Sequence, residues 1–130
     1  MLNFFQPIPV YIKLSVNHIE VTRLDKDETV SQTATKKFSN ERLIIADYEQ
    51  VRSILKKMLS QLLSNGQFGF IRPQLDIVMH QVDYIDGGLS PTEKRILIDV
   101  AQKIGGRKVV VEEGKNHLTT NEVKQLLKQK

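Results

Sequence analysis

The sequence contains no cysteine, which excludes a disulfide framework, catalysis by a thiol and a zinc site with cysteine ligands. The absence fits a reducing compartment, so a cytoplasmic location is the default expectation. No run approaches the roughly 18 to 20 apolar residues that a membrane-spanning helix needs. Residues 1–10 also lack the charged and apolar regions of a signal peptide. We therefore expect a soluble protein with no membrane span.

Aromatic residues are few, at 6% of the chain, and are not interleaved with basic residues in a pattern that could stack bases. The net charge of +4 arises from basic residues in scattered pairs, most of them flanked by acids. No RNP-like, zinc-finger or helix-turn-helix signature is present. Mixed charge of this kind is usual on the surface of a soluble domain, so we expect no nucleic-acid ligand.

Common catalytic motifs are absent as well. The sequence contains neither GxGxxG nor GxxxxGK(S/T), and none of its three histidines has a metal spacing such as that of HExxH. Asp83, Asp86 and Glu93 surround a pair of glycines and could form an acid cluster. A solvated loop before a helix N-terminus explains the same acids without any chemistry. We therefore predict no metal site, no cofactor and no catalytic residue.

The 130 residues, 40% hydrophobic and 26% charged, suit one compact domain. We assign residues 10–113 to its core and residues 114–130 to a tail. The N-terminal segment, residues 1–9, is apolar at first but contains two prolines, which prevent a helix of useful length. We expect Phe4 and Phe5 to cover part of the core; the alternative is a short arm that touches a membrane.

Three strands are predicted near the N-terminus. Apolar and polar residues alternate along residues 10–16 and again along residues 19–22, which is typical of strands with one buried face. Asn17 and His18 form the turn between them, so the pair reads as a hairpin. A threonine-rich run, residues 29–35, predicts a third strand at a sheet edge.

The clearest predicted helix begins after Asp47, with Gln50 completing a capping-box spacing. Its apolar residues follow the i, i+3, i+4, i+7 rule without a miss as far as Leu63. Asn65 and Gly66 are expected to end it. We interpret its leucine and methionine stripe as core and not as a cofactor site.

Residues 75–111 read as a strand, a glycine loop, a helix and a strand, and the rest of the chain can be arranged around them. The first strand is apolar enough to be covered on both faces. Ser90, Pro91 and Glu93 give a complete helix start, with a serine cap, proline at the first position and glutamate at the third. The two strands should be parallel, because a helix joins them.

A compact β-branched strand occupies residues 107–113. Thr119 and Glu122 then form another capping-box spacing, which predicts a short C-terminal helix. The predicted order is therefore three antiparallel strands, helix, strand, helix, strand and short helix, in an α/β fold with a mixed sheet. That order is the layout of the ribonuclease-H-like half-domain of actin-type proteins.

Three segments carry a closer resemblance. ADYEQVRSILKKMLSQL resembles a helix, FIRPQLDIVM a strand entry, and GGLSPTEKRILIDVAQKIGGRKVVVEE a helix and strand of one family. Together they cover roughly residues 43–113 and resemble the first subdomain of the MreB-type, rod-shape-determining bacterial actin homologues. The resemblance implies a nucleotide-binding ancestry and an association with cell shape.

The departures from that family concern the nucleotide site. Its first hairpin carries a DLGT phosphate loop, whose aspartate works through the metal and whose glycine lets backbone amides approach the phosphates. The equivalent stretch here is IKLSVN, with Lys13 at the place of the aspartate and Ser15 at that of the first glycine. Glu93 falls on the family's helix glutamate, implicated there in ordering the attacking water, although its capping box is a sufficient structural explanation here.

The resemblance stops after Glu113, and the second phosphate loop, the adenosine pocket and the second domain have no counterpart in the sequence. We therefore expect no enzyme activity, with Lys13 and Ser15 as degenerate phosphate-loop positions and Glu93 as a vestigial site. The preferred function is a non-catalytic interaction or scaffold module, linked to the cell-shape or envelope machinery that the relatives serve. The alternative is a domain that senses a nucleotide or small ligand weakly at the end of the sheet holding Lys13, Ser15 and Glu93.

An interaction module needs a surface for its protein partner, which the sequence does not identify. The strand edge at residues 107–113 or the helix faces suggest self-association, with a homodimer as the expected form. The residues predicted to form this surface are Arg107, Val109, Val111 and Glu113.

Overall fold

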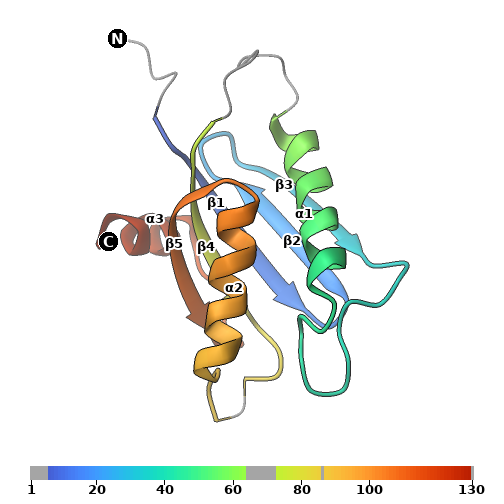
Figure 1. Cartoon of the computed structure of the whole chain (residues 1–130). Coiled ribbons are helices and arrows are strands. Elements are labelled where there is room, and N and C mark those ends of the chain that lie inside the picture. Colours follow the sequence, from blue (N-terminus) through green and yellow to red (C-terminus); the bar gives the residue numbers. More distant parts are fainter. Residues whose placement is uncertain (1–5, 64–72, 86, 130) are drawn as a thin grey trace.

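The computed structural model describes residues 6–63, 73–85 and 87–129. Its elements are, in chain order, β1 (Ile8–Ser15), β2 (His18–Arg23), β3 (Glu28–Thr33), α1 (Tyr48–Leu63), β4 (Leu75–Gln81), α2 (Pro91–Lys103), β5 (Gly106–Glu113) and α3 (Thr120–Gln129). The strands form one sheet in the order β3-β2-β1-β4-β5 (Figure 1). This is the mixed α/β fold and the element order that the sequence predicts.

Some expectations lie outside the described residues. They are the core-covering role of Phe4 and Phe5, the helix end at Asn65 and Gly66, and the part of Asp86 in an acid cluster. Among the described helices, none is long and apolar enough to cross a membrane.

The sheet is mixed. β2 pairs antiparallel with both β1 and β3, whereas β4 pairs parallel with both β1 and β5. The predicted parallel pair of strands around α2 is thus confirmed. Because β1 and β4 are parallel neighbours, with Leu14 opposite Gln81, their carboxyl ends lie side by side. Ligands of open α/β sheets usually bind at such an edge.

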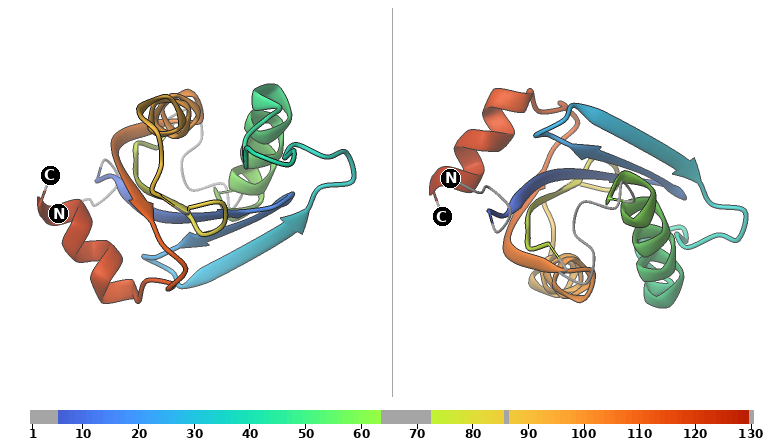
Figure 2. Two further views of the ribbon diagram at one scale, coloured as in Figure 1. Left: turned by 90° about the horizontal axis from the view of Figure 1, so that it is seen from below. Right: turned by 90° about the horizontal axis from the view of Figure 1, so that it is seen from above.

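Helices cover both faces of the sheet. α1 and α2 lie on one face, and α3 lies on the other (Figure 2). The larger core, under α1 and α2, contains Val10, Ile12 and Leu14 of β1, whereas Tyr11 of the same strand belongs to the smaller core under α3. Adjacent residues of β1 therefore face opposite layers, as the alternation of a strand requires. β4 is covered on both faces, as its apolar run predicts.

The starts of α2 and α3 have the predicted capping boxes, whereas at α1 the Gln50 N–H donates to Asp47 Oδ1 at 3.1 Å. At α2, the Glu93 N–H donates to the Ser90 Oγ at 3.1 Å while the Ser90 N–H donates to the Glu93 carboxylate at 2.9 Å. The same reciprocal pair joins Thr119 and Glu122 before α3. α3 packs on the sheet through Val123 and other apolar residues. These short helices are thus positioned by local polar contacts as well as by burial.

The β1–β2 turn anchors a distant segment. Asn17 adopts a left-handed backbone conformation, with φ of 54°, which asparagine tolerates better than most residues. Its side-chain oxygen accepts hydrogen bonds from the backbone N–H groups of Phe38, at 2.9 Å, and Ser39, at 2.8 Å. These bonds hold the connection between β3 and α1 against the carboxyl end of β1.

Candidate functional site

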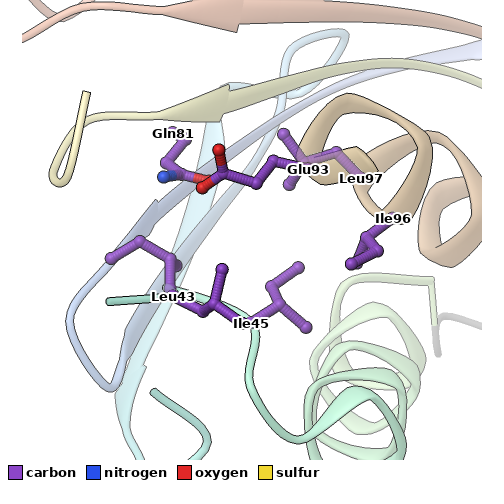
Figure 3. A pocket seen from close by; sticks show the side chains of 7 residues that line it. Leu43, Ile45, Gln81, Glu93, Ile96 and Leu97 are labelled. Atoms are coloured by element: carbon purple, nitrogen blue, oxygen red, sulfur yellow. The ribbon is translucent and has the colours of Figure 1, made fainter. Parts of the chain in front are cut away.

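A small pocket lies between the carboxyl end of β4, the first turns of α2 and the segment before α1 (Figure 3). It is lined by Leu43, Ile44, Ile45, Gln81, Glu93, Ile96 and Leu97. Its volume of ≈ 10 Å³ is about the space that one water molecule needs. Gln81 and Glu93 supply its polar groups. The pocket occupies the expected ligand-binding edge but, in this conformation, has no room for a nucleotide.

Glu93 lines this pocket while completing the capping box of α2. One of its carboxylate oxygens already accepts the Ser90 N–H, so the predicted capping role is confirmed. Figure 3 shows its side chain directed toward Gln81. Gln81 is 3% exposed, and its side-chain Nε2 donates to the backbone oxygen of Asp83 at 3.0 Å. Both polar groups of the pocket therefore also hold local structure in place.

The loop after β4 is exposed at Tyr84, Gly87 and Gly88 and partly buried at Val82, Asp83 and Ile85. Gly87 and Gly88 adopt positive φ angles of 80° and 84°, which the glycine pair predicts. Asp83 accepts a hydrogen bond of 3.3 Å from the Val16 N–H, so this acid, like Glu93, binds a backbone donor. Within the residues that the structure describes, no group of three or more His, Cys, Asp or Glu side chains could hold a metal ion.

Lys13 lies on the other face of the sheet. Its Nζ forms an ion pair of 2.9 Å with Glu20 on β2 and a hydrogen bond of 2.7 Å to Nδ1 of His117. The ammonium also lies 5.4 Å from the centre of the Tyr11 ring, within cation–π range. The charge of Lys13 is therefore balanced inside the fold, beneath the segment that leads to α3.

The residues predicted for a remnant nucleotide site do not converge. Lys13 contacts the layer under α3, whereas Glu93 faces the pocket on the side of α1 and α2. Ser15 is the last residue of β1 and lies opposite His18. It does not line the pocket, and it is not among the residues that contact the Lys13 ammonium. A single ligand of modest size would therefore not meet the Lys13 and Glu93 side chains together.

The structure instead brings together five polar residues that the sequence did not group. We call them the inner polar cluster: Tyr11, Lys13, Glu20, His80 and His117. Their grouping depends on the pairing of β1 with both β2 and β4, which sets Lys13 opposite Glu20 on one side and His80 on the other. The alternation along β1 indicates that Tyr11 and Lys13 lie on the same face of the strand. It does not indicate which residues of β2 and β4 lie beside them, because that depends on how strands distant in the sequence pair.

A chain of hydrogen bonds runs through the buried part of this cluster. The Leu118 N–H donates to the Tyr11 hydroxyl oxygen at 3.0 Å, which leaves the hydroxyl hydrogen to be donated to Nδ1 of His80 at 2.6 Å. Nε2 of His80 then donates to the backbone oxygen of Gly114 at 2.8 Å. This pattern assigns the neutral tautomer with its proton on Nε2.

Burial sets the ionisation of both aromatic groups. Desolvation is the largest cause that lowers the pKa of His80 below its ordinary value, and the hydrogen bond to Gly114 opposes it. Desolvation likewise raises the pKa of Tyr11, against the bond from Leu118. Each shift favours the neutral form. At 4% and 1% exposure, the Tyr11 and His80 side chains hold the start of the tail to the sheet and are closed to a substrate.

The predicted interaction surface lies on β5, which is an edge strand. Arg107 forms a bidentate ion pair with Asp76, with distances of 2.9 and 3.1 Å. The Glu113 carboxylate accepts a hydrogen bond from the Leu89 N–H at 2.6 Å. Val109 and Val111 are partly buried against the larger core. The side chains of this surface thus make contacts within the chain. The groups of β5 that remain for a partner are the backbone N–H and C=O groups on its outer side.

Comparison with solved structures defines the class of fold. The structure is similar to MreB 5 of Spiroplasma citri bound to AMPPNP, with a TM-score of 0.57 and 12% identity, over 83% of this chain and 39% of that chain. It is also similar to the ethanolamine utilization protein EutJ from Carboxydothermus hydrogenoformans, with a TM-score of 0.54 and 12% identity, over 86% and 42% of the two chains. The fold is that of an actin-like half-domain, and the chain spans about two fifths of each solved chain.

Sequence comparison defines the family. No family model matches the chain. The chain is 34% identical over 93 residues to the uncharacterized protein YjaA of Escherichia coli (strain K12). The aligned region covers 70% of this chain and 72% of that protein. The chain belongs to the YjaA family.

Proposed function

We propose that the protein is a non-catalytic interaction module with an actin-like fold, which binds another protein and does not turn over a nucleotide. The observation that supports it most is the environment of Lys13. The resemblance to the MreB-type family places a metal-associated aspartate at this position. Here the side chain is a cation, and its ammonium already binds Glu20 and His117. A metal ion would meet charge of its own sign at this point.

The small pocket at the carboxyl ends of β1 and β4 supports the same proposal. Glu93, which the resemblance aligns with an acid that orders the attacking water, donates and accepts the capping bonds of α2. A volume of ≈ 10 Å³ beside it suits one water molecule. The proposed module thus has the arrangement of the actin-like sheet without the chemistry of a nucleotide site.

The ancestry is part of the proposal. The three segments within residues 43–113 that resemble the MreB-type family form α1, β4, α2 and β5, which are consecutive in the fold. We infer descent from the first subdomain of that family and a role beside cell-shape or envelope machinery. A tagged chain expressed in its native host, cross-linked and purified, is expected to retain a component of that machinery. Retention of an unrelated protein would contradict this role.

Calorimetry tests the absence of nucleotide binding. The full chain, titrated with millimolar ATP or ADP in the presence of magnesium, is expected to give no binding heat. Lys13→Glu and Lys13→Met serve as a matched pair, since the first reverses the charge and the second removes it at similar length. Binding to the native chain that Lys13→Glu abolishes would overturn the proposal in favour of a ligand-sensing domain, and measurable ATP hydrolysis would overturn it outright.

A further inference from the structure

One edge of the sheet is open for pairing. β5 is the outermost strand beyond β4 (Figure 1), and no other strand of the described part of the chain pairs with its outer side. α3 contacts β1, β4 and β5 and lies on the face of the sheet opposite to α1 and α2 (Figure 2). The eight residues Gly106–Glu113 contain no proline. An edge strand of this length without proline presents backbone groups with which another strand can pair.

The hydrogen bonds to β4 show which backbone groups face outward. Gln81 lies opposite Glu113, and the Gly114 N–H donates to the Gln81 carbonyl oxygen at 3.4 Å. The N–H and C=O groups of successive strand residues point to opposite sides. Glu113, Val111 and Val109 therefore direct their backbone groups away from β4. The pairing register shifts between Leu75 and Asp76 of β4, opposite the start of β5. The alternation therefore applies to the residues of β5 from Lys108 onward.

The sequence of β5 is complementary to itself when reversed. It reads Gly-Arg-Lys-Val-Val-Val-Glu-Glu, with two cations before three valines and two anions after them. Two antiparallel copies centred on Val110 would set Val109 opposite Val111 of the second copy. They would also set Lys108, whose ammonium donates to the Leu127 carbonyl oxygen at 2.9 Å, opposite Glu112 of that copy. Opposite charges and β-branched residues in facing positions stabilise antiparallel strands.

We propose that two copies of this chain associate through antiparallel pairing of their β5 strands, with Val110 on the two-fold axis. In this register Val109 and Val111 form hydrogen-bonded pairs, which requires the outward direction of their backbone groups derived above. The contact uses the same surface on both copies, as a two-fold interface does. The inference rests on the proposed function, for which it names the partner surface and one partner.

The opposite edge of the sheet does not offer the same complementarity. β3, ETVSQT, contains a single charged residue, Glu28, so no reversal of this strand brings opposite charges together. The preference for β5 therefore follows from its charge pattern and not merely from its position at an edge.

Charge reversal tests the register. Light scattering and sedimentation of the full chain are expected to show a dimer, which Glu112→Lys weakens at least about tenfold by setting like charges opposite each other. Lys108→Glu has the same effect on the facing charges and also removes the hydrogen bond from Lys108 to the Leu127 carbonyl oxygen. A mixture of the two variants is expected to restore association, because each copy then faces its complement. Lys124→Glu, on the exposed side of α3, makes the same charge change away from β5 and is expected to have no effect.

Removal of an outward N–H tests the backbone contact separately. Val111→Pro deletes a donor that is free in the monomer, so the fold is expected to persist and the dimer to be lost. Val111→Thr keeps the donor and is the matched control. A strict monomer at high concentration, or a dimer indifferent to these changes, would overturn the self-pairing. Nucleotide calorimetry is independent of this result, so either proposal can fail while the other stands.

Discussion

The Tyr11 hydroxyl donates a 2.6 Å hydrogen bond to Nδ1 of His80, and their rings stack with centroids 5.9 Å apart. The two residues belong to neighbouring parallel strands at the centre of the sheet. Through them the backbone of residues 114–118 is held at both ends, at Gly114 by His80 and at Leu118 by Tyr11. The connection to α3 is therefore fixed by side chains from β1 and β4.

The first prediction concerns pH. Burial lowers the pKa of His80 from its ordinary value of 6.5, so below that pH the unfolded chain binds this proton more readily than the folded chain. The free energy of unfolding is therefore expected to fall as the pH decreases from about 7.5 toward 5. Urea unfolding of the native chain and of His80→Gln measures it, and the variant should show the shallower dependence.

His18→Gln is the control for this comparison, since the half-buried His18 is hydrogen-bonded to Thr33 and takes no part in the contacts of His80. It should retain the pH dependence of the native chain. Equal slopes for the native chain and His80→Gln would show that another group is responsible.

The second prediction concerns Tyr11→Phe. The change leaves the Leu118 N–H without its acceptor and Nδ1 of His80 without its donor in a buried place, which should cost about 1–3 kcal/mol. Tyr84→Phe, at a 39% exposed position, should be nearly neutral. Chemical denaturation gives the stabilities, and amide exchange at Leu118 reports the local effect. A loss no greater than that of Tyr84→Phe would contradict the assignment of this contact.

The third prediction separates a structural Glu93 from a catalytic one. Ser90→Ala removes the side-chain acceptor of the α2 cap and should destabilise the fold by about 0.5–2 kcal/mol. Glu93→Gln keeps an oxygen for the Ser90 N–H and should change stability much less. Thermal unfolding of both variants tests this. A large loss for Glu93→Gln alone would mean that its charge, and not its cap, matters.

The fourth prediction concerns the docking of α3. Leu127 is buried in the smaller core, so Leu127→Ala should cost roughly 2–5 kcal/mol, toward the lower end because it lies in the last turn. Lys124→Ala, exposed on the same helix, is the matched control. Exchange of the α3 amides should quicken in the first variant only. If both variants exchange alike, α3 does not depend on this contact.

Much of the fold could be predicted because its signals are local. Alternation gave β1 and β2, and the Ser90-Pro91 start located the first turn of α2 correctly. The third strand was placed at residues 29–35, two residues beyond its observed end at Thr33. Strand ends are weakly encoded when neither face is buried, and β3 is exposed along much of its length.

The inner polar cluster could not be predicted for the opposite reason. Its members come from β1, β2, β4 and the tail, and only the strand register brings them together. Alignment with the MreB-type family suggested a shared end of the sheet for Lys13 and Glu93. It did not say that the Lys13 side chain points to the face under α3, whereas Glu93 belongs to α2 on the opposite face.

The bonds of Tyr11 also bear on the order of folding. They join residues 69 and 107 positions apart, so they cannot form until β1 and β4 have paired and two long loops have closed. We expect α3 to dock after the rate-limiting barrier, with φ-values near zero for its buried residues. Destabilising α3 should then accelerate unfolding while leaving the refolding rate almost unchanged.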